Sequence, residues 1–358
     1  MPSTSGRCGP WTGAFGSRSW PPVLACPAPG WTTSWRGGRP ESTRSPPGLP
    51  RVAHMPRASI VVPSRGGAAR LPVLVASLRA QTEQDVEMIV VIDGDVDDSE
   101  SLVRRLAEDA PVRSIVFPEN RGRAAALNAG FFAAAGDVLI RADDDLELEA
   151  DFVEHHVRLH EEAPRGVIAM CRDVFPETPY ARAYGIEADA AIRAAAFETS
   201  SDRTWEWWSG NVSSTRDDFH AVGGYDESFR AYGWEDVEWG YRLHLLGRDI
   251  LIAPGFTTLH HGPVTSAAER FERAYASGAA YAKFIEKHGA VLPQAQHSAS
   301  LWNTLVAATS RVASSRSVGV AGRLIDRHVD RLPHAVGHKA VALGIQASSS
   351  AGRRRSGR

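Results

Sequence analysis

Cysteine is scarce in this sequence, with three residues in 358. Cys8 and Cys26 lie near the start and Cys171 stands alone, which excludes a disulfide framework and a cysteine-ligated zinc site. No run approaches the roughly 20 apolar residues that span a bilayer. The first residues also lack the charged start and apolar core of a signal peptide. We therefore expect a cytoplasmic protein, soluble or at most peripheral at the membrane face.

Net charge is small as well, because 40 Lys and Arg residues stand against 42 Asp and Glu residues, for a formal charge of −2. This balance provides no bulk positive field, so nucleic acid is not expected as a partner. Residues 1–54 hold six arginines and one acid, which leaves −7 for the rest of the chain. The C-terminal end is again basic, and either docks weakly to an anionic membrane or forms a solvated, partly disordered tail. Its arginines are Arg311, Arg316, Arg323, Arg327, Arg331 and the triplet Arg353, Arg354 and Arg355.

Composition divides the chain into four parts. Residues 1–54 are rich in Pro, Gly and Trp without strand or helix periodicity, so they are either a disordered leader or an extension upstream of a true start at Met55. From Met55 on, strands and helices alternate, which is typical of an α/β domain with a mostly parallel central sheet flanked by helices. We expect a first half at 55–150, a second half at 151–290 and a basic helical extension at 291–358.

Three adjacent acids, Asp143-Asp144-Asp145, follow a predicted buried strand at 138–140. Such neighbours repel one another unless a cation joins them, and alternate residues of an extended chain share a face. Asp143 and Asp145 can therefore direct oxygens at one hard divalent ion, Mn²⁺ or Mg²⁺, whose shell substrate phosphates complete. The alternative is a solvated loop or a helix cap with no metal.

Two further groups of polar residues invite either a structural or a chemical interpretation. Glu235 and Asp236 begin a predicted helix, where a charged first turn is simply favourable. His260 and His261 end a predicted strand at 257–259, and neutral imidazole is a common metal ligand. By contrast, we expect the histidines of the charged helix at 151–162 to be solvated; these are His155, His156 and His160.

The ordered set of motifs over about residues 57–265 resembles glycosyltransferase family 2, whose members have the GT-A fold. The motifs are Ser59-Ile60-Val61-Val62-Pro63, Val90-Val91-Ile92-Asp93-Gly94, Glu119-Asn120-Arg121-Gly122 with Ala126-Leu127-Asn128-Ala129-Gly130, Asp143-Asp144-Asp145, and Gly223-Gly224-Tyr225-Asp226 before Trp234-Glu235-Asp236. The chain departs from the family at Ile92, Leu127, and Arg65 with Gly66, so uracil specificity and the pyrophosphate contacts stay open.

The resemblance implies a role for each candidate residue. Asp143 and Asp145 hold the metal on a donor diphosphate, completed by His260 or His261. Asp236 is the general base, with Glu235 as the alternative base or a sugar contact. A donor site is formed by Pro63, Arg65, Asp93, Arg121 and Asp144. An acceptor and sugar site is formed by Trp208, Gly210, Asn211 and Trp234, although tryptophans this close together are often core residues.

The sequence thus predicts a metal-dependent, inverting glycosyltransferase. It moves a sugar from a nucleoside diphosphate, expected to be UDP, to a hydroxyl of a glycan, a lipid-linked saccharide or a metabolite. Residues 55–150 are then the nucleotide-sugar-binding half and residues 151–290 the acceptor-binding half. Two rivals are a sugar nucleotidyltransferase and a non-catalytic protein that binds carbohydrate or nucleotide-sugar.

Overall fold

The central element is an eight-stranded sheet in a computed structural model that describes residues 55–230, 232–292 and 300–356. The leader expected at 1–54 lies outside the described residues. The order across the sheet is β3-β2-β1-β4-β7-β6-β8-β5. The strands are β1 (Ala58–Ser64), β2 (Val86–Asp93), β3 (Val112–Phe117), β4 (Val138–Ala142), β5 (Leu146–Glu147), β6 (Gly166–Asp173), β7 (Asn211–Thr215) and β8 (Ile250–His260).

The first four strands of this order, β3-β2-β1-β4, are all parallel, as the alternating sequence predicts. Their β-branched and aliphatic residues are buried on both faces, which is typical of a parallel sheet covered by helices on both sides. Because parallel strands end at one edge, Asp93 at the end of β2 and Asp143 just after β4 come to the same edge of the sheet.

The other half of the sheet is mixed. Strand β7 is antiparallel to both β4 and β6, and β6 is parallel to β8. The apolar segments at 250–252 and 257–259 are not separate strands, since both belong to the single longer strand β8. It also pairs with the two-residue β5, in a register that sets Leu146 opposite His260. This short pairing brings His260 next to the acidic loop that precedes β5.

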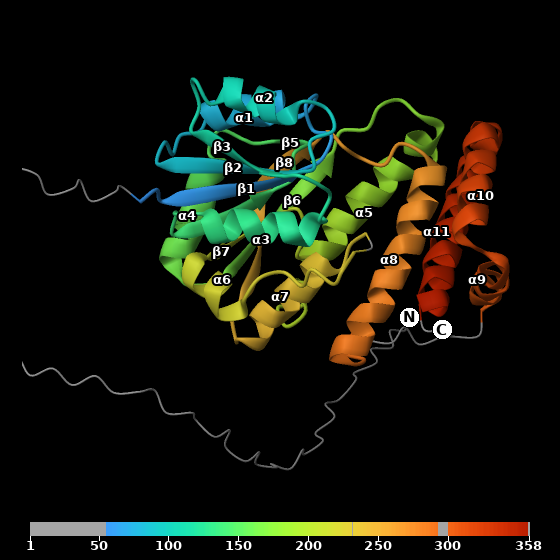
Figure 1. The fold of residues 1–358 in the computed structure, drawn as a ribbon. Helices are drawn as coiled ribbons and strands as arrows, with labels where there is room; N and C mark the ends of the chain where they lie inside the picture. Colours follow the sequence, from blue (N-terminus) through green and yellow to red (C-terminus); the bar gives the residue numbers. More distant parts are fainter. Residues whose placement is uncertain (1–54, 231, 293–299, 357–358) are drawn as a thin grey trace, which may run out of the picture. The chain divides into compact units, whose positions relative to one another are not determined.

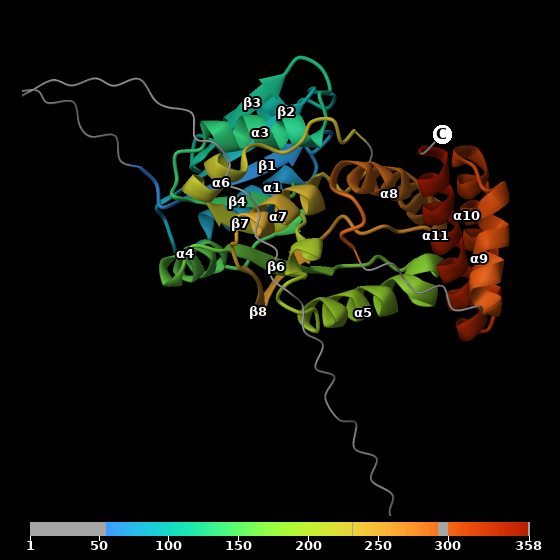
Figure 2. The ribbon, with the colours of Figure 1, turned by 90° about the horizontal axis from the view of Figure 1, so that it is seen from below.

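Helices cover both faces of the sheet (Figures 1 and 2). On β1, Ile60 and Val62 face a core shared with α1 and α4, whereas Val61 faces the core under α3, α6 and α7. Gly130 lets α3 approach closely, since a Cβ there would collide with Val61. The helices are α1 (Leu71–Arg79), α2 (Ser99–Leu106), α3 (Arg123–Ala133), α4 (Phe152–Glu162), α5 (Ile186–Phe197), α6 (Arg216–Val222) and α7 (Glu235–Leu245), with short turns of other helix types at Ala181–Gly185 and Thr204–Trp207.

The C-terminal extension is a helical layer packed on one long helix, α8 (Ala267–His288). It consists of α9 (Leu301–Val312), α10 (Ser315–His328), a short turn at Val329–Arg331 and α11 (His334–Ser356). The prediction of a disordered tail is wrong for the arginine triplet. Arg353 lies over the Tyr281 ring, with its guanidinium carbon 3.8 Å from the ring centroid, and Arg354 donates to the Ser310 hydroxyl at 2.7 Å.

Residues 53–358 form one compact unit, so the boundary that we expect near residue 150 stays a prediction. The sheet runs through both halves. Helix α8 follows β8 in the chain and packs against α10 and α11. Within the described part of the chain, no helix combines the length and apolar character that crossing a bilayer requires.

Candidate active site

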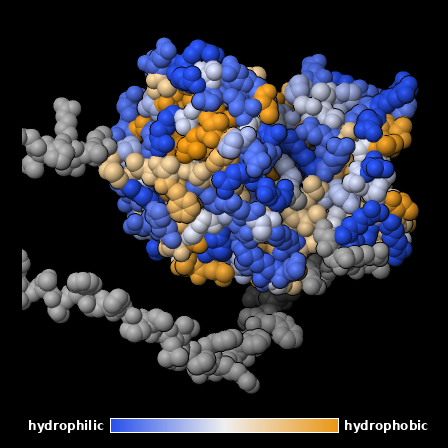
Figure 3. Space-filling view, in the orientation of Figure 1, coloured by the Kyte–Doolittle hydropathy of each residue, from blue (hydrophilic) through white to orange (hydrophobic). Residues whose placement is uncertain are grey.

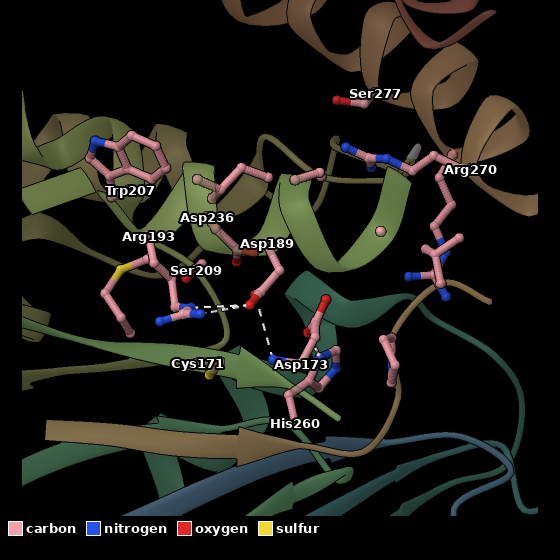
Figure 4. A pocket seen from close by; sticks show the side chains of 18 of the residues that line it. Cys171, Asp173, Asp189, Arg193, Trp207, Ser209, Asp236, His260, Arg270 and Ser277 are labelled. Carbon is pink, nitrogen blue, oxygen red and sulfur yellow. Dashed lines mark hydrogen bonds and ion pairs between the residues drawn. The ribbon is translucent and has the colours of Figure 1, made fainter. Parts of the chain in front are cut away.

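A cavity of about 540 Å³ opens at the strand edge where β6 and β8 end. Figure 4 shows that its polar side chains come from separate elements and face a common space. Asp173 ends β6, His260 ends β8 and Asp236 lies in the first turn of α7. The opposite wall is built by α5 and α8; from these helices come Asp189, Arg193, Arg270, Arg273 and Ser277.

The acidic loop after β4 separates its three carboxylates. Asp145 contacts His260, with 3.2 Å between Oδ2 and Nε2, and its Oδ1 is buried without a hydrogen-bond partner. Asp143 is partly exposed and accepts hydrogen bonds from Arg141 at 3.1 and 3.2 Å. Each of these carboxylates packs against a glycine. A Cβ at Gly262 would collide with Asp145, and a Cβ at Gly210 would collide with Asp143.

His260 bridges two acids, and the second of them was not predicted from the sequence. Its Nδ1 lies 2.6 Å from Asp173 Oδ1, on the other side of the ring from Asp145. Burial opposes the charged imidazole, but hydrogen bonds to Asp145 and Asp173 outweigh it and raise the pKa of His260 to about 10. Asp173 carries a sequence signal only in hindsight, as an acid at the end of a buried strand.

The donor set suits a hard divalent ion, although it is incomplete in the chain alone. The part of the chain described here holds no cluster of three His, Cys, Asp or Glu side chains arranged for a metal. Asp145 and His260 nevertheless adjoin, one carboxylate oxygen is unsatisfied, and Asp143 lies in the same loop. Such a site fits an ion whose shell the donor diphosphate completes. His261 is elsewhere, since its Nε2 pairs with Glu147 Oε2 at 2.6 Å.

The middle acid, Asp144, is a structural residue here, contrary to its predicted place in the donor site. Ser64 donates to its Oδ2 at 2.6 Å, and Arg70 donates to both oxygens at 2.9 and 2.8 Å. The loop is not extended as expected, because residues 144 and 145 form a turn in which the Leu146 N–H donates to the Asp143 carbonyl at 3.3 Å. The bidentate contact fixes the acidic loop to the start of α1. Arg70 was missed, since a single arginine in a sequence rich in arginine carries no signal.

The other predicted donor residues lie around the ends of β1 and β2. Asp93 is buried and accepts backbone N–H bonds from Arg121 at 2.6 Å and Gly122 at 2.9 Å, so it anchors the loop before α3. Any contact of Asp93 with a nucleotide base would share these oxygens. The Arg121 guanidinium lies over the Phe117 ring at 4.7 Å. Pro63 is half-buried in β1, and Arg65 is exposed in the loop that follows.

Arg141 links the two acidic groups of the site and was also missed. Its side chain is 1% exposed, contacts Asp236 through Nη1 and Oδ1, and binds Asp143 through Nη2. Burial alone would lower its pKa, but the charges of Asp143 and Asp236 raise the pKa of Arg141 well above its usual value. The sequence signal was available, because Arg141 interrupts an otherwise apolar strand, Val138-Leu139-Ile140-Arg141-Ala142.

Glu235 and Asp236 point in different directions, as neighbours on a helix do. Asp236 lines the cavity, whereas Glu235 faces Arg123 at 3.6 Å and keeps one buried oxygen without a hydrogen-bond partner. Burial and the neighbouring charge of Asp236 raise the pKa of Glu235 to about 7. The side chain that faces the cavity is thus Asp236.

The predicted sugar-binding cluster is only partly at the cavity. Asn211 is fully buried, donates to the Thr258 hydroxyl at 2.9 Å and does not line the cavity. Trp208 is 2% exposed and packs on Trp239 in the core, which leaves little of its ring available to a sugar. Gly210 makes room for Asp143. Trp234 lines the cavity, held by a bond from its indole N–H to Ser277, and Trp207 lines it too.

The prediction of solvated histidines on α4 is wrong for two of the three. His156 and His160 are buried, and their rings lie 2.7 and 2.8 Å from the single hydroxyl of Ser213 on β7. A hydroxyl shared in this way joins two neutral rings, because it donates to one and accepts from the other. Burial lowers the pKa of His160 to about 4 and places that of His156 well below its usual value. The pair ties α4 to the sheet and lies outside the cavity.

Comparison with known proteins finds a family model that part of this chain matches. Residues 59–232 match the family model described as glycosyl transferase family 2. The chain is 28% identical over 280 residues to a validoxylamine A glucosyltransferase of Streptomyces hygroscopicus subsp. jinggangensis, covering 68% of this chain and 64% of the relative. It is 28% identical over 239 residues to the succinoglycan biosynthesis protein ExoA of Rhizobium meliloti, covering 65% and 71%. The chain thus spans less than two thirds of the length of the first of these relatives.

Among solved structures, the mannosyltransferase PcManGT of Pyrobaculum calidifontis, in complex with GDP-Man and Mn²⁺, matches with a TM-score of 0.56. The match covers 85% of this chain and 89% of the mannosyltransferase at 19% identity, so it establishes the fold. The predicted α/β architecture, a GT-A fold with a C-terminal helical extension, is confirmed.

Proposed function

Since residues 59–232 match the model of glycosyl transferase family 2, we propose that the protein is a metal-dependent, inverting glycosyltransferase that uses a nucleoside-diphosphate sugar. The observation that carries this proposal is that Asp236 and His260, which contacts Asp145 of the acidic loop, line one cavity of about 540 Å³. Asp236 faces the cavity from one side, and His260, which contacts Asp145, faces it from another. One group suits an acceptor hydroxyl, and the other suits a diphosphate bridged by a cation.

In this proposal Asp236 is the general base. Its carboxylate takes the proton of the acceptor hydroxyl while the hydroxyl oxygen forms a bond to the anomeric carbon of the donor sugar. The bond from that carbon to the diphosphate oxygen breaks in the same displacement, which inverts the configuration. Arg141 is a positioning residue, because its contact with Asp236 fixes the carboxylate and its contact with Asp143 ties the base to the diphosphate side of the site.

Asp145 and His260, with Asp143 nearby, would hold a Mn²⁺ or Mg²⁺ ion against the donor diphosphate. The bound ion would neutralise charge that develops on the leaving diphosphate. His260 must give up its proton to bind through nitrogen, since its bridging acids favour the charged ring. Arg65 and Arg121 lie near the strand ends and are the cations that we assign to the donor phosphates. A uracil nucleotide stays the expected donor.

The second wall of the cavity is the proposed acceptor site. Trp207 and Trp234 offer ring faces to a sugar. Arg270 lines the same wall and is half-buried, and its guanidinium forms no hydrogen bond or ion pair with a described residue. An unpaired guanidinium beside ring faces suits a glycan, a lipid-linked saccharide or another hydroxyl acceptor that carries negative charge. We place this acceptor chemistry in the cytoplasm.

The experiment incubates the full chain with a panel of nucleotide-sugars and Mn²⁺ or Mg²⁺, and follows release of the nucleoside diphosphate. Metal-dependent release is expected with one donor class. Asp236→Asn and Asp145→Asn should each lower the rate about 100-fold or more. Asp137→Asn is the matched control, because that carboxylate is exposed at the opposite end of β4 and pairs only with Arg216.

Three other results would contradict this proposal. Donor binding without release in any acceptor mixture would favour a binding protein. Pyrophosphate formation from a nucleoside triphosphate and a sugar phosphate would favour a nucleotidyltransferase. If Glu235→Gln abolished activity and Asp236→Asn retained it, Glu235 would be the base, and the wild-type rate would then rise with pH through about 7.

A further inference from the structure

The apolar side of helix α9 is exposed, although an amphipathic helix normally buries its apolar side. Leu301, Leu305, Ala308 and Val312 repeat at intervals of four, three and four residues, so they form one stripe along the helix. All four are exposed, with Leu301 at 78% and Val312 at 80%. Isolated exposed apolar residues need no explanation, but a complete stripe indicates a surface that meets an apolar partner.

Helix α10 continues this surface with a mixture of apolar and basic side chains. Val320 and Leu324 are one turn apart and are 49% and 56% exposed. They stand among arginines at helical spacing, Arg316, Arg323 and Arg327, all exposed. The guanidinium groups of these arginines and of Arg311 in α9 form no hydrogen bond or ion pair with any residue that the structure describes. Unpaired arginines around apolar residues are typical of helices that lie on a membrane surface.

The exposed sides of the two helices meet at a common cavity. A cavity of about 470 Å³ lies between α8, α9, α10 and α11, and both Val312 and Leu324 line it. Its other walls are mostly apolar and include Phe271 of α8 and Leu343 of α11. Figure 3 shows apolar and hydrophilic patches side by side at the end of the molecule that α9 and α10 form. We call the set Leu301, Leu305, Val312, Val320 and Leu324 with Arg311, Arg316, Arg323 and Arg327 the docking surface.

Charge distribution indicates which partner this surface suits. Residues 291–358 contain nine Arg and one Lys against two Asp, for a formal charge of +8. Residues 55–290 contain 24 basic and 39 acidic residues, for a charge of −15. An anionic surface would attract the C-terminal layer and repel the rest of the domain, which orients the molecule. A symmetric contact between two copies would instead bring the same unpaired arginines together on both sides.

We propose that the docking surface binds the face of an anionic lipid bilayer, with the apolar residues inserted at the headgroup level and the arginines on lipid phosphates. This interaction goes beyond the proposed catalytic function and does not depend on it. The catalytic cavity uses Arg270, Arg273 and Ser277 of α8, whereas the docking surface belongs to the helices packed on the other side of α8. A bound bilayer would therefore leave the cavity free.

The test is co-sedimentation of the full chain with vesicles made of equal parts phosphatidylglycerol and phosphatidylcholine, compared with pure phosphatidylcholine vesicles. We expect binding to the anionic vesicles that weakens as salt is raised. Leu305→Ser combined with Val312→Ser, and separately Arg323→Glu combined with Arg327→Glu, should each weaken binding roughly tenfold or more. The variants should unfold at the wild-type temperature, since all four side chains are exposed.

The matched control is Val73→Ser combined with Arg105→Glu, which changes an exposed apolar residue of α1 and an exposed arginine of α2 far from the docking surface in sequence. This control should bind as the wild type does. Equal binding to both vesicle types would overturn the proposal. Wild-type binding by both docking-surface variants would also overturn it, because the membrane contact would then be made by another basic segment, such as residues 1–54. A concentration-dependent dimer that the Leu305 and Val312 changes dissolve would also overturn it and assign the surface to a second copy.

Discussion

Arg141 connects the base and the acidic loop at the scale of a single residue. It is fully buried and contacts both Asp143, which is partly exposed, and Asp236, which is buried, so the three charges compensate one another. Removing one partner of a buried ionic group leaves the remaining charge uncompensated, which costs more than the loss of an exposed pair. The residue thus serves stability and catalysis through the same contacts.

Arg141→Met should therefore lower the free energy of unfolding by at least about 3 kcal/mol. Urea unfolding at neutral pH measures this change. Adding Asp236→Asn to the same chain should restore part of the loss, because one of the two stranded charges is gone. Arg104→Met is the control, since its ion pair with Glu100 is exposed on α2 and should contribute less than about 1 kcal/mol. A loss no greater than that of the control would contradict the structural role of Arg141.

The buried histidines predict how stability depends on pH. The pKa of His160 is about 4 in the folded protein, against about 6.5 when unfolded. Between these values the unfolded chain binds a proton that the folded chain does not, so stability falls as pH falls from about 6.5 to 4. The loss through His160 is on the order of 3 kcal/mol at most. His156, whose pKa is also lowered by burial, acts in the same direction.

Thermal unfolding measured across this pH range gives the check. His160→Gln keeps a group that can bond to the Ser213 hydroxyl but removes the titration, so its unfolding temperature should fall less steeply below pH 6.5. His220→Gln, an exposed position on α6, should retain the wild-type slope. Equal slopes for the wild type and His160→Gln would show that His160 does not titrate as its burial implies.

Local sequence identifies charged residues that stand in a recognisable pattern. It misses the residues that form hydrogen bonds or ion pairs with them. Asp143, Asp145, Asp236 and His260 were all identified, and the structure brings them to one edge of the sheet. Arg70 and Asp173 were not, because their partners are distant in the sequence, and Arg141 was missed although it interrupts an apolar strand. Asn211 and Trp208 were assigned to sugar binding, but Asn211 is buried in β7, and Trp208 lines the cavity with a ring that is almost fully buried.

At the scale of elements, the close approach of α3 to β1 depends on a missing side chain. Gly130 faces Val61, and a Cβ at residue 130 would collide with that valine and also approach Val91 at 3.1 Å. Gly130→Ala should lower the free energy of unfolding by about 1–3 kcal/mol through overpacking, even though alanine favours helix by about 1 kcal/mol. Urea unfolding measures it, and adding Val61→Ala should recover part of the loss. A more stable Gly130→Ala variant would show that α3 can move away from the sheet.

The predicted strand at 138–140 and the predicted helix at 151–162 agree with β4 and α4 to within two residues, because periodicity there follows a regular parallel sheet. The second half was less predictable. The two-residue β5 has too little sequence to give a pattern, and the single long β8 contains Pro254 and Gly255, which divided it into separate segments. These elements are held by pairing with distant strands, which local propensity does not encode.

At the scale of the whole molecule, α8 is the wall shared by the catalytic cavity and the C-terminal helices. One side of α8 contributes Arg270, Arg273 and Ser277 to the cavity, and the other buries Phe271, Ala274 and Gly278. Gly278 lies against the backbone of α11, where a Cβ would collide with the carbonyl oxygen of Ser349. The position of α8, and with it one wall of the cavity, thus depends on how closely α11 packs.

Gly278→Leu should push α8 and α11 apart, because a backbone carbonyl cannot rotate away as a side chain can. We expect the free energy of unfolding to fall by about 1–3 kcal/mol. In the nucleoside-diphosphate assay, KM for the acceptor should rise more than KM for the donor, since Arg270 and Ser277 move while the acidic loop does not. Glu286→Leu is the control, as it places the same side chain on an exposed position of the same helix. If Gly278→Leu lowered stability but left both KM values unchanged, the cavity wall would be independent of the C-terminal layer, and that layer would serve binding at its outer surface alone.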